Sequence, residues 1–345
     1  MRFFKVVTYN FFIFLFLIII LEVIFGYWFK KENFGIYMRK ERKVNWQTTS
    51  SFYGNDFNFF YKRNFWGFRG EEFDPKDVKL IFEGGSTGNQ RFTPENLTIV
   101  GLLNDSFKNL NHNIKIYNAS TDGKSLNGYI NDFNFWFPKI PNFNPKYVIF
   151  YIGINDKFDS FDGRYFLDNK VSEQKFDQLK DYIKNNSFLV DKFKFIKNKY
   201  FPKNTFAYDL GNDSLYENYV FVDYQMALKI HGNVDDKNLA LIKNFRLKLN
   251  KLNTIIKKKK IKAIFINQLM YDGLKDKNLF LVNNELKNFA LENNHYLIAL
   301  DEILIMKEND YFDTAHTTPQ GSKRIASKIF PLILKFLKEN NEIKE

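Results

Sequence analysis

The stretch Val78–Asn89, VKLIFEGGSTGN, is the strongest indication of the fold. In it, a short apolar run is followed by two glycines and a serine. The run Val78–Glu83 has the length and residue types of a buried strand. Glycines beside Ser86 predict a tight turn into a helix, which would raise the serine hydroxyl above the sheet edge and aim its N–H at an oxyanion. The motif lacks the GxGxxG spacing of a dinucleotide site and the Gly-Lys-Ser/Thr of a phosphate loop. A plain tight turn is the alternative.

Working outward, short apolar runs alternate with longer amphipathic stretches. Further strands are predicted at Ile114–Asn118, Tyr147–Ile152, Ala263–Asn267 and Tyr296–Leu300. Helices are predicted around 95–111, 124–137, 236–259 and 278–293, with a last one from Gly321 to Lys338. Alternation of this kind predicts an α/β fold with a flavodoxin-like, doubly wound parallel sheet. Active sites of such sheets form at the carboxyl ends of the strands.

The remaining segments define a predicted domain organisation. Residues 1–30 are expected to form a transmembrane anchor, 31–75 a connecting segment, and 76–340 one catalytic domain. No core strand is apparent between the third strand and Ala263. Residues of about 158–235 are therefore expected to be an insertion over or beside the site, as lids often are.

Composition excludes several classes of function. The 345 residues include no cysteine, which excludes disulfides, thiolate catalysis and cysteine-based metal sites. Lys and Arg outnumber Asp and Glu by 51 to 39, and a scattered basic surface is the simplest interpretation. The dense run Lys257–Lys260 ends a predicted helix, where lysines are favourable. No zinc-ligand set or RNA-binding aromatic motif accompanies it, so no nucleic-acid partner is expected.

The amino-terminal stretch Phe11–Phe25 reads FFIFLFLIIILEVIF and is apolar on every side. With the flanking residues it is long enough to cross a bilayer as a helix. No small-residue cleavage site follows, which favours an uncleaved single-pass anchor over a signal peptide. Glu22, the one ionisable residue of the apolar stretch, lies near its end, where snorkelling or pairing with the following lysines would satisfy it.

Charge alone places the large domain in the cytoplasm. Two basic residues, Arg2 and Lys5, precede the helix, and six follow it between Lys30 and Lys43. The positive-inside rule then predicts a cytoplasmic carboxyl side, although long domains can be translocated despite such a bias.

Two further motifs follow predicted strands. Asn118–Gly123, NASTDG, follows the second strand, and Gly123 could direct a backbone N–H into the same crevice. Gly153–Asp156, GIND, follows the third strand, and Asn155 could donate a side-chain N–H to an oxyanion. Taken singly, both motifs are also typical of turns.

The fourth motif is Asp313–His316, DTAH, just before the last helix. A carboxylate three residues before a histidine can hold Nδ1–H and leave Nε2 to accept a serine proton. Of the four histidines, His316 alone has this local partner.

In order and spacing, these four motifs resemble the SGNH (GDSL-like) hydrolase superfamily. The resemblance covers roughly residues 76–335. It implies a catalytic triad of Ser86, Asp313 and His316. It also implies an oxyanion hole from the N–H of Ser86, the N–H of Gly123 and the side chain of Asn155, with Asp156 bracing its loop.

One departure concerns the first motif, where Gly85 replaces the aspartate of the family's Gly-Asp-Ser. A Gly-Gly-Ser version is similar to a membrane-anchored branch found around surface polysaccharides, as is the stretch Asn64–Phe73, NFWGFRGEEF. This resemblance implies an extracytoplasmic catalytic domain, in conflict with the charge count.

The resemblance implies a serine esterase or O-acyltransferase acting on an ester, with a small acyl group on a carbohydrate as the expected substrate. No cofactor and no metal are expected. One alternative is a non-catalytic, membrane-tethered binding or assembly protein of surface polysaccharide on the same fold. A second is a nucleotide-binding Rossmann protein, which the glycine spacing disfavours. Hydrolysis or transfer, acyl group, acceptor and oligomeric state stay open.

Overall fold

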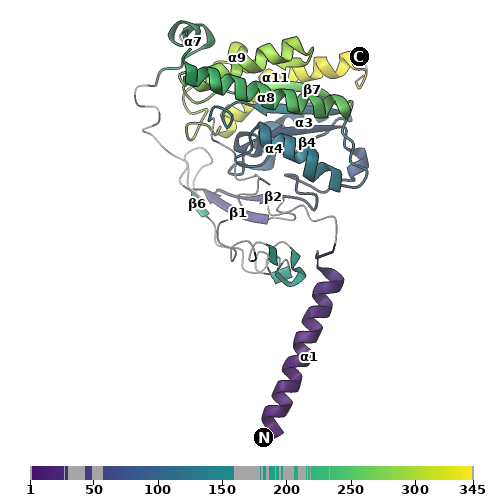
Figure 1. Ribbon diagram of the computed structural model, residues 1–345. Coiled ribbons are helices and arrows are strands. Elements are labelled where there is room, and N and C mark those ends of the chain that lie inside the picture. Colours follow the sequence, from purple (N-terminus) through teal and green to yellow (C-terminus); the bar gives the residue numbers. More distant parts are fainter. Residues whose placement is uncertain are drawn as a thin grey trace.

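The computed structural model describes residues 2–26, 28–29, 43–48, 57–158, 206–208, 219–232 and 234–343, with single positions between 179 and 196 and at 215 and 217. A long helix, α1, extends away from a main body that contains the larger sheet, and a small sheet lies between the two (Figure 1). Much of the predicted insertion of about 158–235 lies outside the described residues, so its predicted bounds stay a prediction.

The larger sheet has five parallel strands, as the alternating pattern predicts. They are β3 (Leu80–Gly84), β4 (Ile116–Asn118), β5 (Tyr147–Ile152), β7 (Lys262–Asn267) and β8 (Tyr296–Ile298). Their order is β4-β3-β5-β7-β8. The strand order reverses between β3 and β5, because the first crossover runs to one side of β3 and the next to the other. Ligand sites of such sheets lie at this switch point.

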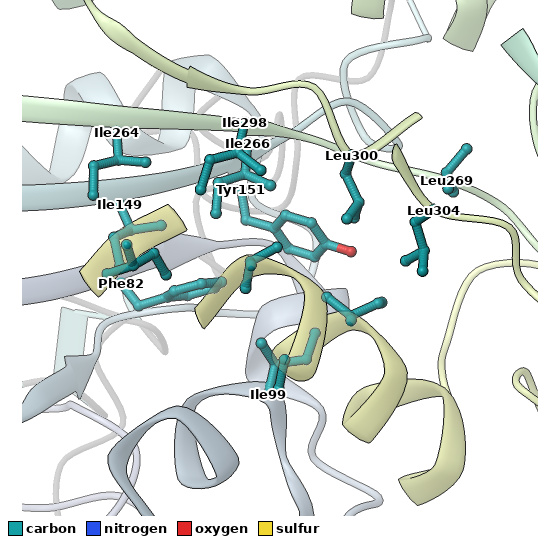
Figure 2. Close-up of a cluster of buried hydrophobic side chains, with 14 of the residues drawn as sticks. Phe82, Ile99, Ile149, Tyr151, Ile264, Ile266, Leu269, Ile298, Leu300 and Leu304 are labelled. Carbon is teal, nitrogen blue, oxygen red and sulfur yellow. The ribbon is translucent and has the colours of Figure 1, made fainter. Parts of the chain in front are cut away.

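Helices cover both faces of this sheet, which explains why most residues of its strands are apolar and buried. Packing against one face are α3 (Ile99–Asn109) and α11 (Pro319–Glu339); on the other face are α4 (Leu126–Asn131), α8 (Asp236–Lys258) and α9 (Lys277–Glu292). Alternate residues of each strand enter opposite cores. Figure 2 shows one of these cores, in which Phe82, Ile149 and Ile264 from neighbouring strands gather with Ile99 of α3.

The predicted strands and helices agree with these bounds to within a few residues, apart from the stretch 124–137. There, α4 gives way to a wider π-helical turn at Asp132–Trp136 and a 3₁₀ turn at Phe137–Lys139. Pro138 lies inside that last turn, and a proline has no N–H to continue an α-helical ladder.

The second sheet was not predicted. Strands β1 (Lys43–Thr48) and β2 (Phe57–Lys62) pair antiparallel, and β6 (Phe206–Tyr208) of the insertion pairs parallel to β1. The small sheet therefore joins the predicted connecting segment to the insertion. Two short elements, η1 (Pro75–Asp77) and η2 (Glu95–Leu97), and the helices α7 (Tyr224–Ile230) and α10 (Leu300–Ile303) complete the connections around the main sheet.

The amino-terminal helix α1 (Arg2–Phe25) projects from the body (Figure 1). Its stretch Phe3–Phe25 is, among the described residues, the one helix long and apolar enough to cross a membrane, and its most apolar window is not buried against the protein. Length and composition of this kind also occur in signal sequences, so the structure supports an apolar helix that could anchor the chain.

Candidate active site

Ser86 begins the short helix α2 (Ser86–Asn89), directly after β3. Gly85 precedes the helix, and its carbonyl accepts hydrogen bonds from the N–H groups of Gly88 (3.1 Å) and Asn89 (2.9 Å). The first N–H groups of a helix have no acceptor within it, so the N–H of Ser86 is available to an incoming oxygen. The side chain of Ser86 is half-buried, which suits a hydroxyl that must meet a substrate.

Gly85 explains how the Gly-Gly-Ser motif brings Asn155 to the serine. A Cβ atom added to Gly85 would lie 2.3 Å from Nδ2 of Asn155 and 3.0 Å from the carbonyl oxygen of Lys124. Nδ2 of Asn155 donates a hydrogen bond to that carbonyl at 2.8 Å. An amide carries two N–H groups, so one fixes the side chain of Asn155 and the other is left for an oxyanion beside Ser86.

Lys124 itself is held in the interior by two carboxyl groups. Its ammonium group contacts Oε2 of Glu83 at 2.7 Å and the carbonyl of Ala119 at 2.8 Å, and it also pairs with Asp132. All three charged side chains are buried. Sequence reasoning missed this cluster, because a lysine between Gly123 and Ser125 has no pattern that distinguishes it from a surface lysine.

Burial shifts the pKa values of this cluster. It raises the pKa of Glu83 well above the ordinary value, although the nearby Lys124 opposes the shift. Burial would lower the pKa of Lys124, but the attraction of Asp132 and Glu83 outweighs it and raises that pKa. Burial also raises the pKa of Asp132, against the attraction of Lys124. The two carboxyl groups thus share one buried cation.

Gly123 lies in the loop after β4 with a φ of 75°, a left-handed conformation that glycine adopts without strain. Its neighbour Asp122 accepts a hydrogen bond at 2.7 Å from Nδ2 of Asn89, the last residue of α2. The side chain of Arg91 pairs with the same carboxylate at 2.9 Å. The loop that carries Gly123 is thereby attached to the helix that begins at Ser86.

Asp156 has the bracing contact expected of it. Its Oδ1 accepts the N–H of Leu126, at the start of α4, at 2.8 Å. The carboxyl is buried, and burial raises its pKa from 3.8 to about 7, against the opposing effect of that hydrogen bond. The loop carrying Asn155 is thus tied to the chain that follows Lys124.

Asp313 and His316 form the predicted pair. Oδ2 of Asp313 lies 2.7 Å from Nδ1 of His316, and Oδ1 accepts the N–H groups of Ala315 (2.8 Å) and His316 (2.7 Å). Burial acts to raise the pKa of Asp313, but these hydrogen bonds and the imidazole prevail and lower it. An ionised Asp313 holds the proton on Nδ1, so that Nε2 is free to act as a base.

A chain of aromatic rings supports the histidine from the side. The ring of Phe312 stacks on His316 with centroids 5.7 Å apart and planes 11° from parallel. Phe92 contacts Phe312 at 6.2 Å and Trp46 of β1 at 4.9 Å. The small sheet thus reaches the histidine loop, a connection that the sequence did not reveal.

Gln90 links the serine and histidine motifs. It follows α2 and donates a hydrogen bond through Nε2 to Oγ1 of Thr317 at 2.9 Å, next to His316. Within the described part of the chain, no hydrogen bond joins Oγ of Ser86 to the His316 ring. Catalytic hydrogen bonds are often long before substrate binds and tighten in the reacting complex. The structure therefore brings both motifs to one region and leaves their final contact open.

No group of three His, Asp or Glu side chains suited to a metal ion occurs among the described residues. The loops after β3, β4 and β5 carry backbone and side-chain N–H groups, and the loop of residues 313–316 carries an imidazole bound to a carboxylate. This arrangement suits acyl transfer, in which N–H donors stabilise an oxyanion.

Comparison with known proteins places the chain in a family. A sequence model of GDSL-like lipases and acylhydrolases matches residues 52–329. The chain belongs to the GDSL-like lipase/acylhydrolase family. The family is one of hydrolases, and its match spans β2 to α11, including the Ser86, Gly123, Asn155 and His316 motifs. No curated protein matches the sequence significantly.

Solved structures that resemble this chain are distant in sequence. The psychrotrophic esterase EstA from Pseudoalteromonas sp. is 11% identical, with a TM-score of 0.44, covering 76% of this chain and 100% of its own. A G-D-S-L family lipolytic protein from Veillonella parvula is 14% identical, with a TM-score of 0.43 and coverages of 75% and 99%. Axe2, an acetyl xylan esterase from Geobacillus stearothermophilus, is 13% identical, with a TM-score of 0.42 and coverages of 78% and 98%.

Proposed function

We propose that this family member is a serine esterase or O-acyltransferase in which Ser86 is the nucleophile and the Asp313–His316 pair is its base. The observation that carries the proposal is the 2.7 Å contact between Oδ2 of Asp313 and Nδ1 of His316. Thr317, on the same loop as this pair, accepts a hydrogen bond from Gln90. Gln90 directly follows the helix that Ser86 begins.

The proposed reaction begins with proton transfer from Oγ of Ser86 to Nε2 of His316 as Oγ attacks the ester carbonyl. The N–H groups of Ser86 and Gly123 and Nδ2 of Asn155 stabilise the negative oxygen of the tetrahedral intermediate. The intermediate collapses, His316 returns the proton to the departing alcohol, and the acyl group remains on Ser86. Water or a second hydroxyl then attacks the acyl-enzyme, with His316 again accepting the proton.

The proposed substrate is a small acyl group, such as acetyl, on a carbohydrate. The Gly-Gly-Ser motif and the stretch Asn64–Phe73 support it through their resemblance to a branch found around surface polysaccharides. Support also comes from α1, which could hold the enzyme at a membrane surface. We propose that α1 is a single-pass anchor and that the catalytic unit is extracytoplasmic.

The decisive test uses the full chain in detergent micelles. A fluorophosphonate probe should label the wild-type protein and the control Ser106→Ala, whose serine lies on α3, but not Ser86→Ala. Acetyl-ester turnover should fall in Ser86→Ala and His316→Ala by about 10⁴-fold or more. Equal rates in the wild type and both variants would refute the enzymatic proposal and favour a binding or assembly protein.

Two further measurements separate the remaining choices. Product analysis with and without an added sugar acceptor distinguishes transfer from hydrolysis, because only transfer forms an acylated acceptor. Protease treatment of intact cells tests the side of the membrane, since an extracytoplasmic unit should be cleaved without lysis.

A further inference from the structure

Glu22, near the end of α1, binds the start of a helical turn in the insertion. Its Oε1 accepts the hydroxyl of Ser187 at 2.6 Å and the N–H of Leu189 at 3.1 Å, and its Oε2 accepts the N–H of Phe188 at 3.0 Å. The carboxylate therefore satisfies N–H groups that have no acceptor within their own helix. A negative charge is also favourable at that end of a helix.

Further contacts complete this junction. Oγ of Ser187 accepts the N–H of Val190 at 3.1 Å. The N–H groups of Phe188, Leu189 and Val190, which begin the helical turn, therefore all have acceptors. The indole Nε1 of Trp28 donates to Oε2 of Glu22 at 2.9 Å. The predicted pairing of Glu22 with the following lysines involves residues outside the described ones. Among the described residues, Glu22 joins segments 165 residues apart in the chain.

Aromatic rings pack around the same contact. The rings of Phe25 and Phe188 have centroids 5.3 Å apart, and those of Trp28 and Tyr182 are 5.6 Å apart. In Figure 1 the short helical pieces of this segment, coloured teal, lie beside the end of α1 nearest the body. The helical pieces therefore lie at the level where α1 would leave the hydrocarbon of a bilayer.

The segment also carries the chemistry of a membrane surface. Four of its large apolar side chains outside the junction are exposed, namely Leu179, Ile183, Phe193 and Ile196, and the ring of Tyr182 is also partly exposed beside Trp28. The stretch 179–200 reads LKDYIKNNSFLVDKFKFIKNKY and contains six lysines against two aspartates. Helices that lie in the headgroup region combine aromatic and aliphatic residues with lysines in this way, and anionic lipids attract them.

We propose that the described helical pieces between Leu179 and Ile196 form a second membrane contact, seated in the headgroup region of an anionic bilayer and held against α1 by Glu22. The inference rests on the proposed anchoring by α1. A lipid surface covers the exposed apolar side chains, and the four hydrogen bonds to Glu22 keep a carboxylate paired at that depth. The insertion continues to β6, which pairs with β1, so two contacts rather than one flexible tether set the height of the site above the bilayer.

The absence of cysteine allows a direct test. Single cysteines replace Phe193, Leu291 or Phe14 in the full chain, each labelled with an environment-sensitive fluorophore, and the proteins are reconstituted in phosphatidylcholine–phosphatidylglycerol vesicles. Leu291, on α9 in the main body, is the matched control for Phe193, because both side chains are 69% exposed. Phe14, in the middle of α1, reports the anchor alone.

A nitroxide on the lipid headgroup should quench the probe at position 193 and not at 291, while a nitroxide in the acyl chain should quench the probe at 14. Quenching at 14 without quenching at 193, or equal quenching at 193 and 291, would overturn the inference and leave the anchor intact. No quenching at 14 would overturn the anchor and the inference together. Adding Glu22→Ala should reduce quenching at 193 but not at 14; unchanged quenching at 193 would refute the role of Glu22.

Discussion

The groups around Ser86 and those around His316 are held in different ways. Asn155 and the loop of Gly123 are fixed from the interior, through the carbonyl of Lys124 and the buried carboxyls of Glu83 and Asp132. His316 is half-exposed, and its ring contacts the carboxylate of Asp313 and the stacked ring of Phe312. The difference in support fits the two proposed roles. N–H donors stabilise an oxyanion best when they are rigid, whereas a base must rotate between the nucleophile and the leaving group.

The largest expected effect tests the half-exposed side. In Asp313→Asn, the amide oxygen can keep the N–H groups of Ala315 and His316 and turn its NH₂ group toward Nδ1. The imidazole proton then moves to Nε2, which can no longer accept the proton of Ser86. We expect kcat/KM for an acetyl ester to fall about 10⁴-fold with little change in Tm. Asp105→Asn on α3 is the control, and a loss below about 10-fold would contradict the assigned role.

The interior side should respond through stability as well as rate. Lys124→Met leaves Glu83 and Asp132 buried without their cation, and breaking a buried pair costs about 3–5 kcal/mol. Thermal unfolding should show a lower Tm, and activity should fall because the carbonyl that holds Asn155 shifts. Lys335→Met, which removes an exposed pair with Glu339, should change neither. Equal stability of the two variants would mean that the buried cluster is not an anchor.

The buried Asp156 makes the interior side sensitive to pH. Its pKa is about 7 in the folded protein against 3.8 in the unfolded chain. The folded state therefore binds the extra proton, and its stability falls as pH rises from about 4 to about 7, by up to roughly 4 kcal/mol. Asp156→Asn keeps the acceptor for the N–H of Leu126 and should flatten this fall. Unfolding measurements from pH 4 to pH 8 check it; parallel curves for the two proteins would refute it.

A smaller effect is expected at Gly85, which lies between Ser86 and the side chain of Asn155. In Gly85→Ala the added Cβ would lie 2.3 Å from Nδ2 of Asn155, so the amide must move. Losing one oxyanion donor costs about 10²–10³-fold in kcat, and partial displacement should give about 10²-fold or less. Gly232→Ala is the matched control, because its Cβ would meet nothing closer than 3.7 Å. Unaltered kcat in Gly85→Ala would separate Asn155 from the chemistry.

The smallest effect concerns the ring beneath the histidine. Phe312→Leu keeps an apolar side chain but removes the stacking contact with His316, which is worth about 0.5–1.5 kcal/mol for aromatic pairs. Activity should therefore fall by roughly 2- to 10-fold, without a change in substrate preference. Phe60→Leu on β2, an exposed position, serves as the control. A loss as large as that of Asp313→Asn would mean that the ring, and not the carboxylate, positions the base.

Most of the main sheet could be predicted because each of its strands is a short apolar run in the local sequence. Tyr147–Ile152 is apolar at every position, and a strand covered on both faces requires that pattern. The small sheet could not be predicted in this way. Its strands β1 and β2 are short and rich in polar residues, and β6 reaches β1 from a distant part of the insertion.

The sequence by itself determined the alternation of strands and helices, the apolar amino-terminal helix, and the Asp313–His316 pair, because each depends on residues a few positions apart. Only the tertiary structure decided that Lys124 holds Asn155, that Gln90 joins the serine and histidine motifs, and that Glu22 caps a turn of the insertion. These contacts join groups far apart in the chain. Each gives a polar group, taken from water, a hydrogen-bond partner that lies distant in the chain, and no local pattern in the sequence identifies that partner.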